Sequence, residues 1–171
     1  MEEAVDRIAY EHTGLKNIYL EQLAALAGLK RHPEGRVLTV AYMALVRYED
    51  VKNKVKPVTT YMRQAQWFDI TEVPELAFDH NDILQLGLKK LKRNLNYSTA
   101  PFALLPEKFT LTQLQQIYEA ILGESLDKRN FRKRMSNLGY LKELNEYQTG
   151  VSYRAARLYK FDKRKFLKLF S

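Results

Sequence analysis

The chain has 171 residues, of which 46% are hydrophobic and 12% aromatic, so it can build a real core, and disorder is disfavoured. It has no cysteine, which excludes disulfide bridges and cysteine-ligated zinc, and its three histidines lack metal-site spacing. Its formal net charge is +8, and residues 101–171 hold most of the excess, with 14 lysines and arginines against 7 acidic residues. This asymmetry favours an acidic polymer, ahead of an anionic membrane, as the partner.

The start of the chain does not look like a targeting segment. Glu2 and Glu3 follow Met1, whereas a signal peptide begins with basic residues. The longest strongly apolar run, Leu23–Leu29, is far too short to span a membrane. We therefore expect a soluble, cytoplasmic protein with no membrane partner.

Spacing and turn residues predict a mixed helix and strand arrangement in the first half. A helix over residues 2–12 should end at Thr13 and Gly14. The segment Arg31–Arg36 is a predicted turn, and Val51–Val58 a basic loop or edge. Three segments are predicted strands: Tyr19–Ala27, Val37–Tyr48 and Gln66–Ile70. Trp67 is expected in the core rather than as a stacking platform.

A further helix is predicted over about residues 80–95. Asp79 is its expected N-cap, and Asp82 lies in its first turn. Its apolar residues recur with helical spacing: Ile83, Leu84, Leu88, Leu91 and Leu95. The segment Asn94–Pro101 is the predicted linker. We therefore expect one domain over residues 1–96 and a second over residues 97–171.

The second domain should begin with two helices separated by a short turn. The first covers Thr110–Leu122, where Thr110 and Gln113 have the spacing of a capping box. Gly123 should end this helix, and Asp127–Leu138 is the second. This is the order of a helix-turn-helix.

The second of these helices has an apolar stripe and a basic face. Phe131, Met135 and Leu138 recur at i, i+4 and i+7, and Asp127 can cap the first turn. Arg134 is off the basic face and should contact phosphate or another part of the protein. Four residues form the basic face: Lys128, Arg129, Arg132 and Lys133. The alternative interpretation is a solvated surface, the usual role of a charge run.

A basic hairpin is predicted next. Its strands would be Tyr140–Leu144 and Ala155–Phe161, followed by a packing helix over Lys163–Phe170. A helix-turn-helix followed by a basic hairpin is the winged-helix arrangement, in which the second helix enters the major groove and the wing follows the DNA backbone. The expected DNA contacts are Lys128, Arg129, Asn130, Arg132, Lys133, Arg154 and Arg157. Arg129 and Arg132 are the candidates for guanine and Asn130 for adenine, whereas Arg154 and Arg157 should contact phosphate.

Phe109–Leu141 resembles the winged-helix half of the Nudix-related transcriptional regulators of the NrtR type. Tyr19–Leu45 resembles the late strands of their Nudix domain, and Trp67–His80 resembles its exit. The resemblance implies an α+β protein, with an α/β Nudix-like domain, incomplete at its N-terminus, followed by a winged helix-turn-helix. It also implies ADP-ribose, a related nucleotide or a sugar derivative as the effector.

Only the tail of the Nudix box GX5EX7REUXEEXGU is present, at Arg7–Leu15. Four positions match it: Arg7, Glu11, Gly14 and Leu15. Ile8 and His12 stand where the pattern has glutamates. Nudix chemistry needs several carboxylates on one helix face to hold Mg²⁺ against a pyrophosphate. We therefore predict no catalytic residue, no metal site and no cofactor. The alternative is a Nudix hydrolase of nucleoside diphosphate derivatives such as ADP-ribose.

Together these features predict a ligand-responsive transcriptional regulator that binds double-stranded operator DNA as a homodimer. Arg31 and Arg36 are candidate effector contacts, because guanidinium groups suit phosphate, although surface solvation is the commoner role. Glu11 is a third candidate, weighed against an ordinary surface acid. A protein-binding winged helix is a further alternative, which the basic helix and wing disfavour.

Overall fold

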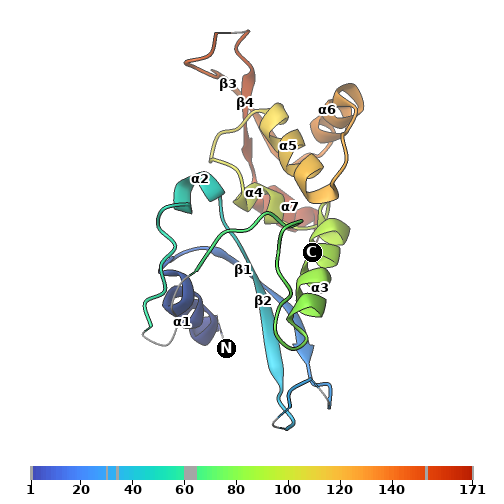
Figure 1. The fold of residues 1–171 in the computed structure, drawn as a ribbon. Helices are drawn as coiled ribbons and strands as arrows, with labels where there is room; N and C mark the ends of the chain where they lie inside the picture. Colours follow the sequence, from blue (N-terminus) through green and yellow to red (C-terminus); the bar gives the residue numbers. More distant parts are fainter. Residues whose placement is uncertain (1, 30, 34, 60–64, 153, 171) are drawn as a thin grey trace. The chain divides into compact units, whose positions relative to one another are not determined.

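The computed structural model describes residues 2–29, 31–33, 35–59, 65–152 and 154–170, with all their side chains except those of Glu2 and Phe170. The chain forms two compact units, residues 1–90 and 91–171 (Figure 1). No helix among the described residues is long and apolar enough to cross a membrane.

The N-terminal unit is built around an antiparallel hairpin. Its strands are β1 (Tyr19–Leu26) and β2 (Thr39–Leu45). Its helices are α1 (Glu2–Thr13), α2 (Tyr48–Val51) and α3 (His80–Asn94), of which α3 continues past Lys90 into the second unit. Ile8 of α1 and Val40 of β2 line a common apolar cavity of about 490 Å³. On α3, Lys90 Nζ lies 2.9 Å from Glu21 Oε1 of β1. The hairpin therefore lies between α1 and α3 (Figure 1).

The helices and the hairpin of this unit largely agree with the sequence predictions. The predicted α1, β1 and α3 are confirmed, with α3 directly following Asp79. The predicted strand Val37–Tyr48 is shorter, since β2 covers only Thr39–Leu45 and Tyr48 begins α2.

The predicted strand at Gln66–Ile70 is wrong. These residues have no strand pairing in the described part of the chain and are exposed. Trp67, predicted in the core, is 45% exposed and meets Tyr48 edge to face, with ring centroids 5.5 Å apart. The strand preference of aromatic and β-branched residues reflects packing against neighbouring strands. No strand pairs with Gln66–Ile70 among the described residues, so this packing is absent there.

Gly14 ends α1 in a conformation that other residues avoid. Its φ is +72°, and its N–H donates to the Tyr10 carbonyl at 2.7 Å. Lys56 passes close by, because its N–H donates to the Thr13 carbonyl at 3.0 Å. A Cβ on Gly14 would lie only 2.9 Å from the Lys56 carbonyl oxygen. Both the backbone angle and the space therefore require glycine.

Gly14→Ala should destabilise the N-terminal unit by about 1–2 kcal/mol from the left-handed backbone alone. Gly87→Ala is the matched control, because its Cβ would meet Leu23 Cδ2 at an ordinary 3.6 Å. Alanine there should stabilise α3 by roughly 0.5–1 kcal/mol. Urea unfolding followed by the fluorescence of Trp67, which lies in the same unit, measures both variants. A Gly14→Ala protein as stable as the wild type would contradict this account of the turn.

The C-terminal unit has the order of a winged helix. Its helices are α4 (Ala100–Ala103), α5 (Leu111–Leu122), α6 (Lys128–Ser136) and α7 (Lys163–Phe170). Its hairpin pairs β3 (Leu141–Tyr147) with β4 (Arg157–Phe161) in antiparallel register. The predicted two helices, hairpin and final helix are thus confirmed, with β3 longer than predicted.

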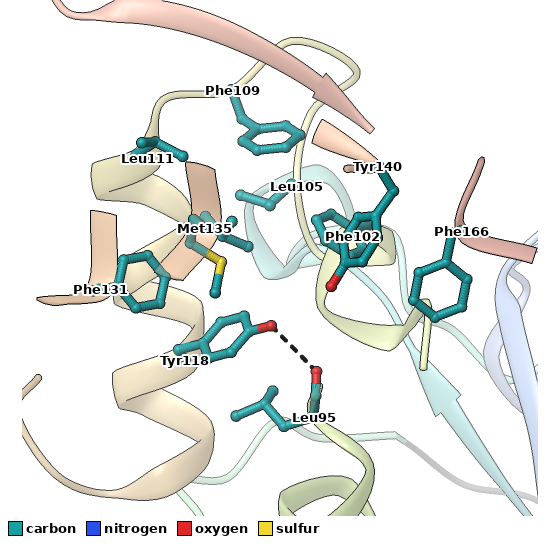
Figure 2. Close-up of a cluster of buried hydrophobic side chains, with 11 residues drawn as sticks. Leu95, Phe102, Leu105, Phe109, Leu111, Tyr118, Phe131, Met135, Tyr140 and Phe166 are labelled. Atoms are coloured by element: carbon teal, nitrogen blue, oxygen red, sulfur yellow. Dashed lines mark hydrogen bonds between the residues drawn. The ribbon is translucent and has the colours of Figure 1, made fainter. Parts of the chain in front are cut away.

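The hydrophobic core lies in this unit. Every described residue that is buried falls between Leu95 and Phe166. Figure 2 shows Tyr118 of α5 and the α6 residues Phe131 and Met135 pointing into one cluster. The Tyr118 hydroxyl donates to the Leu95 carbonyl at 3.3 Å, which satisfies a fully buried polar group, and burial raises the pKa of the phenol. The core thereby joins the end of α3 to α5 and α6.

The predicted linker Asn94–Pro101 contributes its two ends to this core. Leu95, Ala100 and Pro101 are buried, and the last two begin α4. Proline is tolerated in the first turn of a helix, where its missing N–H costs nothing. Residues 95–99 between α3 and α4 form turns and bends, as the composition predicts, and the buried residues at the two ends of the segment attach it to the core.

Candidate nucleic-acid interface

The turn between α5 and α6 is held by caps and by one carboxylate. Thr110 and Gln113 form the predicted capping box, and Gly123 ends α5 with φ +76°. Glu119 accepts hydrogen bonds from the Leu126 N–H at 2.8 Å and from the Gln115 amide at 2.9 Å. The Leu126 N–H holds the pKa of the Glu119 carboxyl below its usual range. These contacts fix the direction in which α6 leaves the turn.

Helix α6 presents one side to the core and the other to solvent. The Asp127 carboxylate caps it by accepting from the Asn130 N–H at 2.7 Å. Phe131 and Met135 of the predicted apolar stripe are buried, whereas Leu138 follows the end of α6 and packs half-buried against the core. The basic face is exposed: Lys128, Arg129, Arg132 and Lys133. No carboxylate within 4 Å pairs with these four cations in the described part of the chain.

The two flanks of α6 differ. On one flank, the Arg134 guanidinium lies 5.6 Å from the ring centroids of both Tyr118 and Phe131. Such a cation over aromatic faces is attracted by their quadrupoles, so Arg134 contacts another part of the protein, one of its two predicted roles. Asn130 lines a small pocket of about 260 Å³ with Arg134, away from Arg132.

On the other flank, α6 and the wing enclose a cationic groove of about 600 Å³. From α6 it is lined by Arg132 and Ser136. From the hairpin it is lined by Tyr147, Arg154, Ala155, Ala156, Arg157 and Tyr159. Leu111, the first residue of α5, completes the lining. We call this site the wing groove. It brings Arg132, Arg154 and Arg157 together, whereas Lys128, Arg129 and Lys133 lie outside it.

Sequence reasoning missed the acidic partners of the wing. Arg157 forms an ion pair with Glu143, and its Nη2 donates to the Tyr147 hydroxyl at 2.9 Å. Two further ion pairs join this region to the segment before α5: Lys160–Glu107 at 2.5 Å and Lys108–Glu146 at 2.5 Å. The hairpin register would have revealed the Glu143–Arg157 pair. Glu143 is opposite Tyr159 and therefore diagonal to Arg157.

The three candidate effector contacts do not share one cavity. The Arg31 guanidinium donates from Nε to Asp79 Oδ2 at 2.8 Å and from Nη2 to Asp79 Oδ1 at 3.1 Å. The Arg31 side chain is only 9% exposed, and its contact holds the pKa of the Asp79 carboxyl below the usual range. Arg31 therefore ties the loop after β1 to the start of α3.

The other two candidates are surface residues. Glu11 Oε1 pairs with Arg7 Nη1 at 2.8 Å, one turn away on α1. Arg36 is exposed. A pocket of about 520 Å³ beside Arg31, Asp82 and Lys89 includes neither of them in its lining.

The C-terminal unit is similar to a known DNA-binding domain. Residues 101–161 match the family model of the NrtR DNA-binding winged helix domain. The matched residues include α5, α6 and both strands of the wing, and with them the wing groove.

The similarity continues beyond the NrtR domain. The chain is 37% identical over 153 residues, or 88% of its length, to the ADPR-responsive transcriptional repressor NtrR of Acinetobacter baylyi. It spans 59% of that repressor's length. The crystal structure of Shewanella oneidensis NrtR with a 27mer DNA matches 97% of this chain and 74% of that one, with a TM-score of 0.77 and 28% identity. The predicted resemblance to NrtR-type regulators and the α+β fold class are thereby confirmed.

A third relative is an enzyme. An ADP-ribose pyrophosphatase of Methanocaldococcus jannaschii is 31% identical over 85 residues, which are 50% of this chain and 47% of that protein. The similarity thus includes a repressor over most of the chain and a pyrophosphatase over half of it.

Proposed function

We propose that this chain acts as a ligand-responsive transcriptional regulator, with a winged helix that binds operator DNA and a Nudix-like unit that senses an effector. The observation that carries the proposal is the exposed basic face of α6 beside the wing groove, because its cations have no described carboxylate partner. The 27mer DNA bound to the Shewanella relative and the ADPR response of the Acinetobacter repressor support it. Such a regulator works in the cytoplasm, where its DNA is.

In this proposal two surfaces share the DNA contacts. Arg129 and Lys133 are exposed on α6. If α6 lies in the major groove, these two side chains would meet the base edges. In the wing groove, Arg154 and Arg157 suit a phosphate of the DNA backbone. Arg132 belongs to both surfaces, since it is exposed on α6 and lines the wing groove.

A single winged helix makes few base contacts, so a homodimer on a two-fold operator would double them. An effector such as ADP-ribose would then act by a coupling free energy, moving the two α6 helices away from the spacing of the half-sites. The effector contacts would come from Glu11, Arg31 and Arg36, of which the two guanidinium groups suit a phosphate.

Selection of bound sequences from random duplex DNA tests the proposal. We expect a palindromic sequence to be enriched, and ADP-ribose to release it from the protein. Failure to enrich any sequence would overturn the regulator proposal, and release by no nucleotide or sugar would overturn the sensing part alone.

The relative that cleaves ADP-ribose makes hydrolysis the second candidate function. We expect no formation of AMP from ADP-ribose above background with Mg²⁺ or Mn²⁺, because Ile8 and His12 replace two carboxylates of the metal-binding helix. Glu11, the remaining one, pairs with Arg7. Turnover that Glu11→Gln abolishes would show that the chain is an enzyme.

A further inference from the structure

We infer that Glu143 competes with DNA phosphate for Arg157, and that it thereby limits the sequence-independent DNA affinity of the wing. This role rests on the proposed function, since it concerns the same wing groove. An acidic residue of β3 would then help to set the DNA affinity, alongside the basic residues of α6 and the wing.

The contacts of Arg157 are the first step. Its guanidinium is paired with the Glu143 carboxylate and donates to the Tyr147 hydroxyl at 2.9 Å. It also lies 5.4 Å from the centroid of the Tyr147 ring. The Tyr159 hydroxyl donates to the same carboxylate, to Glu143 Oε2, at 3.4 Å. Glu143 therefore holds two residues that line the wing groove, Arg157 and Tyr159.

The charge balance of the wing groove is the second step. Its lining contains three guanidinium groups, those of Arg132, Arg154 and Arg157. Among the described side chains, Arg157 is the only one of the three with a carboxylate within 4 Å. Arginine keeps its charge at all relevant pH values, so Glu143 and a DNA phosphate are rival anions for the Arg157 guanidinium.

The strength of the pair is the third step. The Arg157 and Glu143 side chains are 42% and 48% exposed, so water screens their attraction. Exposed pairs of this kind shift an equilibrium by only about 1.4- to 5-fold. A DNA phosphate, whose binding also releases counterions, can therefore displace Glu143. The pair weakens binding to every DNA sequence, because a phosphate contact carries no sequence information.

The other acidic residues near the wing supply a matched control. Glu146 is on the same strand and pairs with Lys108, which does not line the wing groove. Glu143→Gln and Glu146→Gln change the net charge equally, so they share any long-range attraction to DNA. A difference between them isolates the release of Arg157.

Fluorescence anisotropy on the selected duplex and on a scrambled duplex, over a salt series, tests the inference. Glu143→Gln should bind both duplexes about 2- to 5-fold more tightly than Glu146→Gln. Its salt slope should be steeper by about 1, as for one added phosphate contact. In an Arg157→Ala background, Glu143→Gln should give no more than the Glu146→Gln gain.

A second arm separates this inference from the proposed function. On phosphocellulose, which presents phosphate without any base sequence, Glu143→Gln should elute at higher salt than Glu146→Gln. If neither duplex binds yet this shift appears, the regulator proposal fails and the role of Glu143 stands. If both variants bind DNA and phosphocellulose alike, the role of Glu143 is wrong, whether or not the protein reads sequence.

Discussion

Phe131→Ala is expected to lower the free energy of unfolding of the C-terminal unit by about 3–5 kcal/mol. The Phe131 ring is 4% exposed and meets the Tyr118 ring edge to face, with centroids 5.2 Å apart. Its removal leaves a cavity and also takes away one of the two rings under Arg134. Because this ring packs α6 against α5, the loss should appear first as faster hydrogen exchange of the α6 amides.

Hydrogen exchange of the α5 and α6 amides measures this effect where it occurs, since the only tryptophan, Trp67, is in the other unit. Lys133→Ala is the control on the same helix, because its side chain is exposed and its change should stay within about 0.5 kcal/mol. Wild-type protection of α6 in Phe131→Ala would mean that this ring does not hold the helix in place.

Alanine at both Arg129 and Arg132 should produce the largest loss of DNA recognition. If each guanidinium pairs with the O6 and N7 of a guanine, each substitution costs about 1–3 kcal/mol on the selected sequence. The cost on scrambled DNA should be much smaller, so the ratio of the two affinities falls. Arg132 also lines the wing groove, so its share of the loss on scrambled DNA should exceed that of Arg129.

Arg164→Ala with Lys165→Ala is the control for this double variant. It removes the same charge from exposed positions on α7, outside α6 and the wing groove. Its affinities for the two duplexes should fall together, which leaves their ratio unchanged. If the Arg129 and Arg132 double variant behaves like this control, α6 does not lie in the major groove.

Local patterns were sufficient to predict the C-terminal unit. The capping box at Thr110, the glycine at Gly123 and the stripe of Phe131 and Met135 each act within one or two turns of helix, so the sequence states them directly. The basic face of α6 follows from the same spacing. These features together define a helix-turn-helix before any tertiary contact is known.

Features that depend on distant partners were not predictable in this way. The segment Gln66–Ile70 has the composition of a strand but lacks a neighbouring strand among the described residues. The contact of Arg31 with Asp79 joins two residues far apart in the chain, which spacing does not predict. The Glu143–Arg157 pair depends on the hairpin register, which loop composition does not determine. Each of these features depends on a residue or strand elsewhere in the chain, which local spacing does not reveal.

Sequence-specific DNA binding through α6 is tested most directly by the anisotropy of two labelled duplexes, the selected palindrome and a scrambled one of equal length and composition, across a salt series. We predict that the wild-type chain binds the palindrome at least about 10³-fold more tightly than the scrambled duplex. We also predict that the logarithm of both affinities falls linearly with the logarithm of the salt concentration. Equal affinity for the two duplexes at every salt concentration would contradict the assignment of α6 as the reading helix.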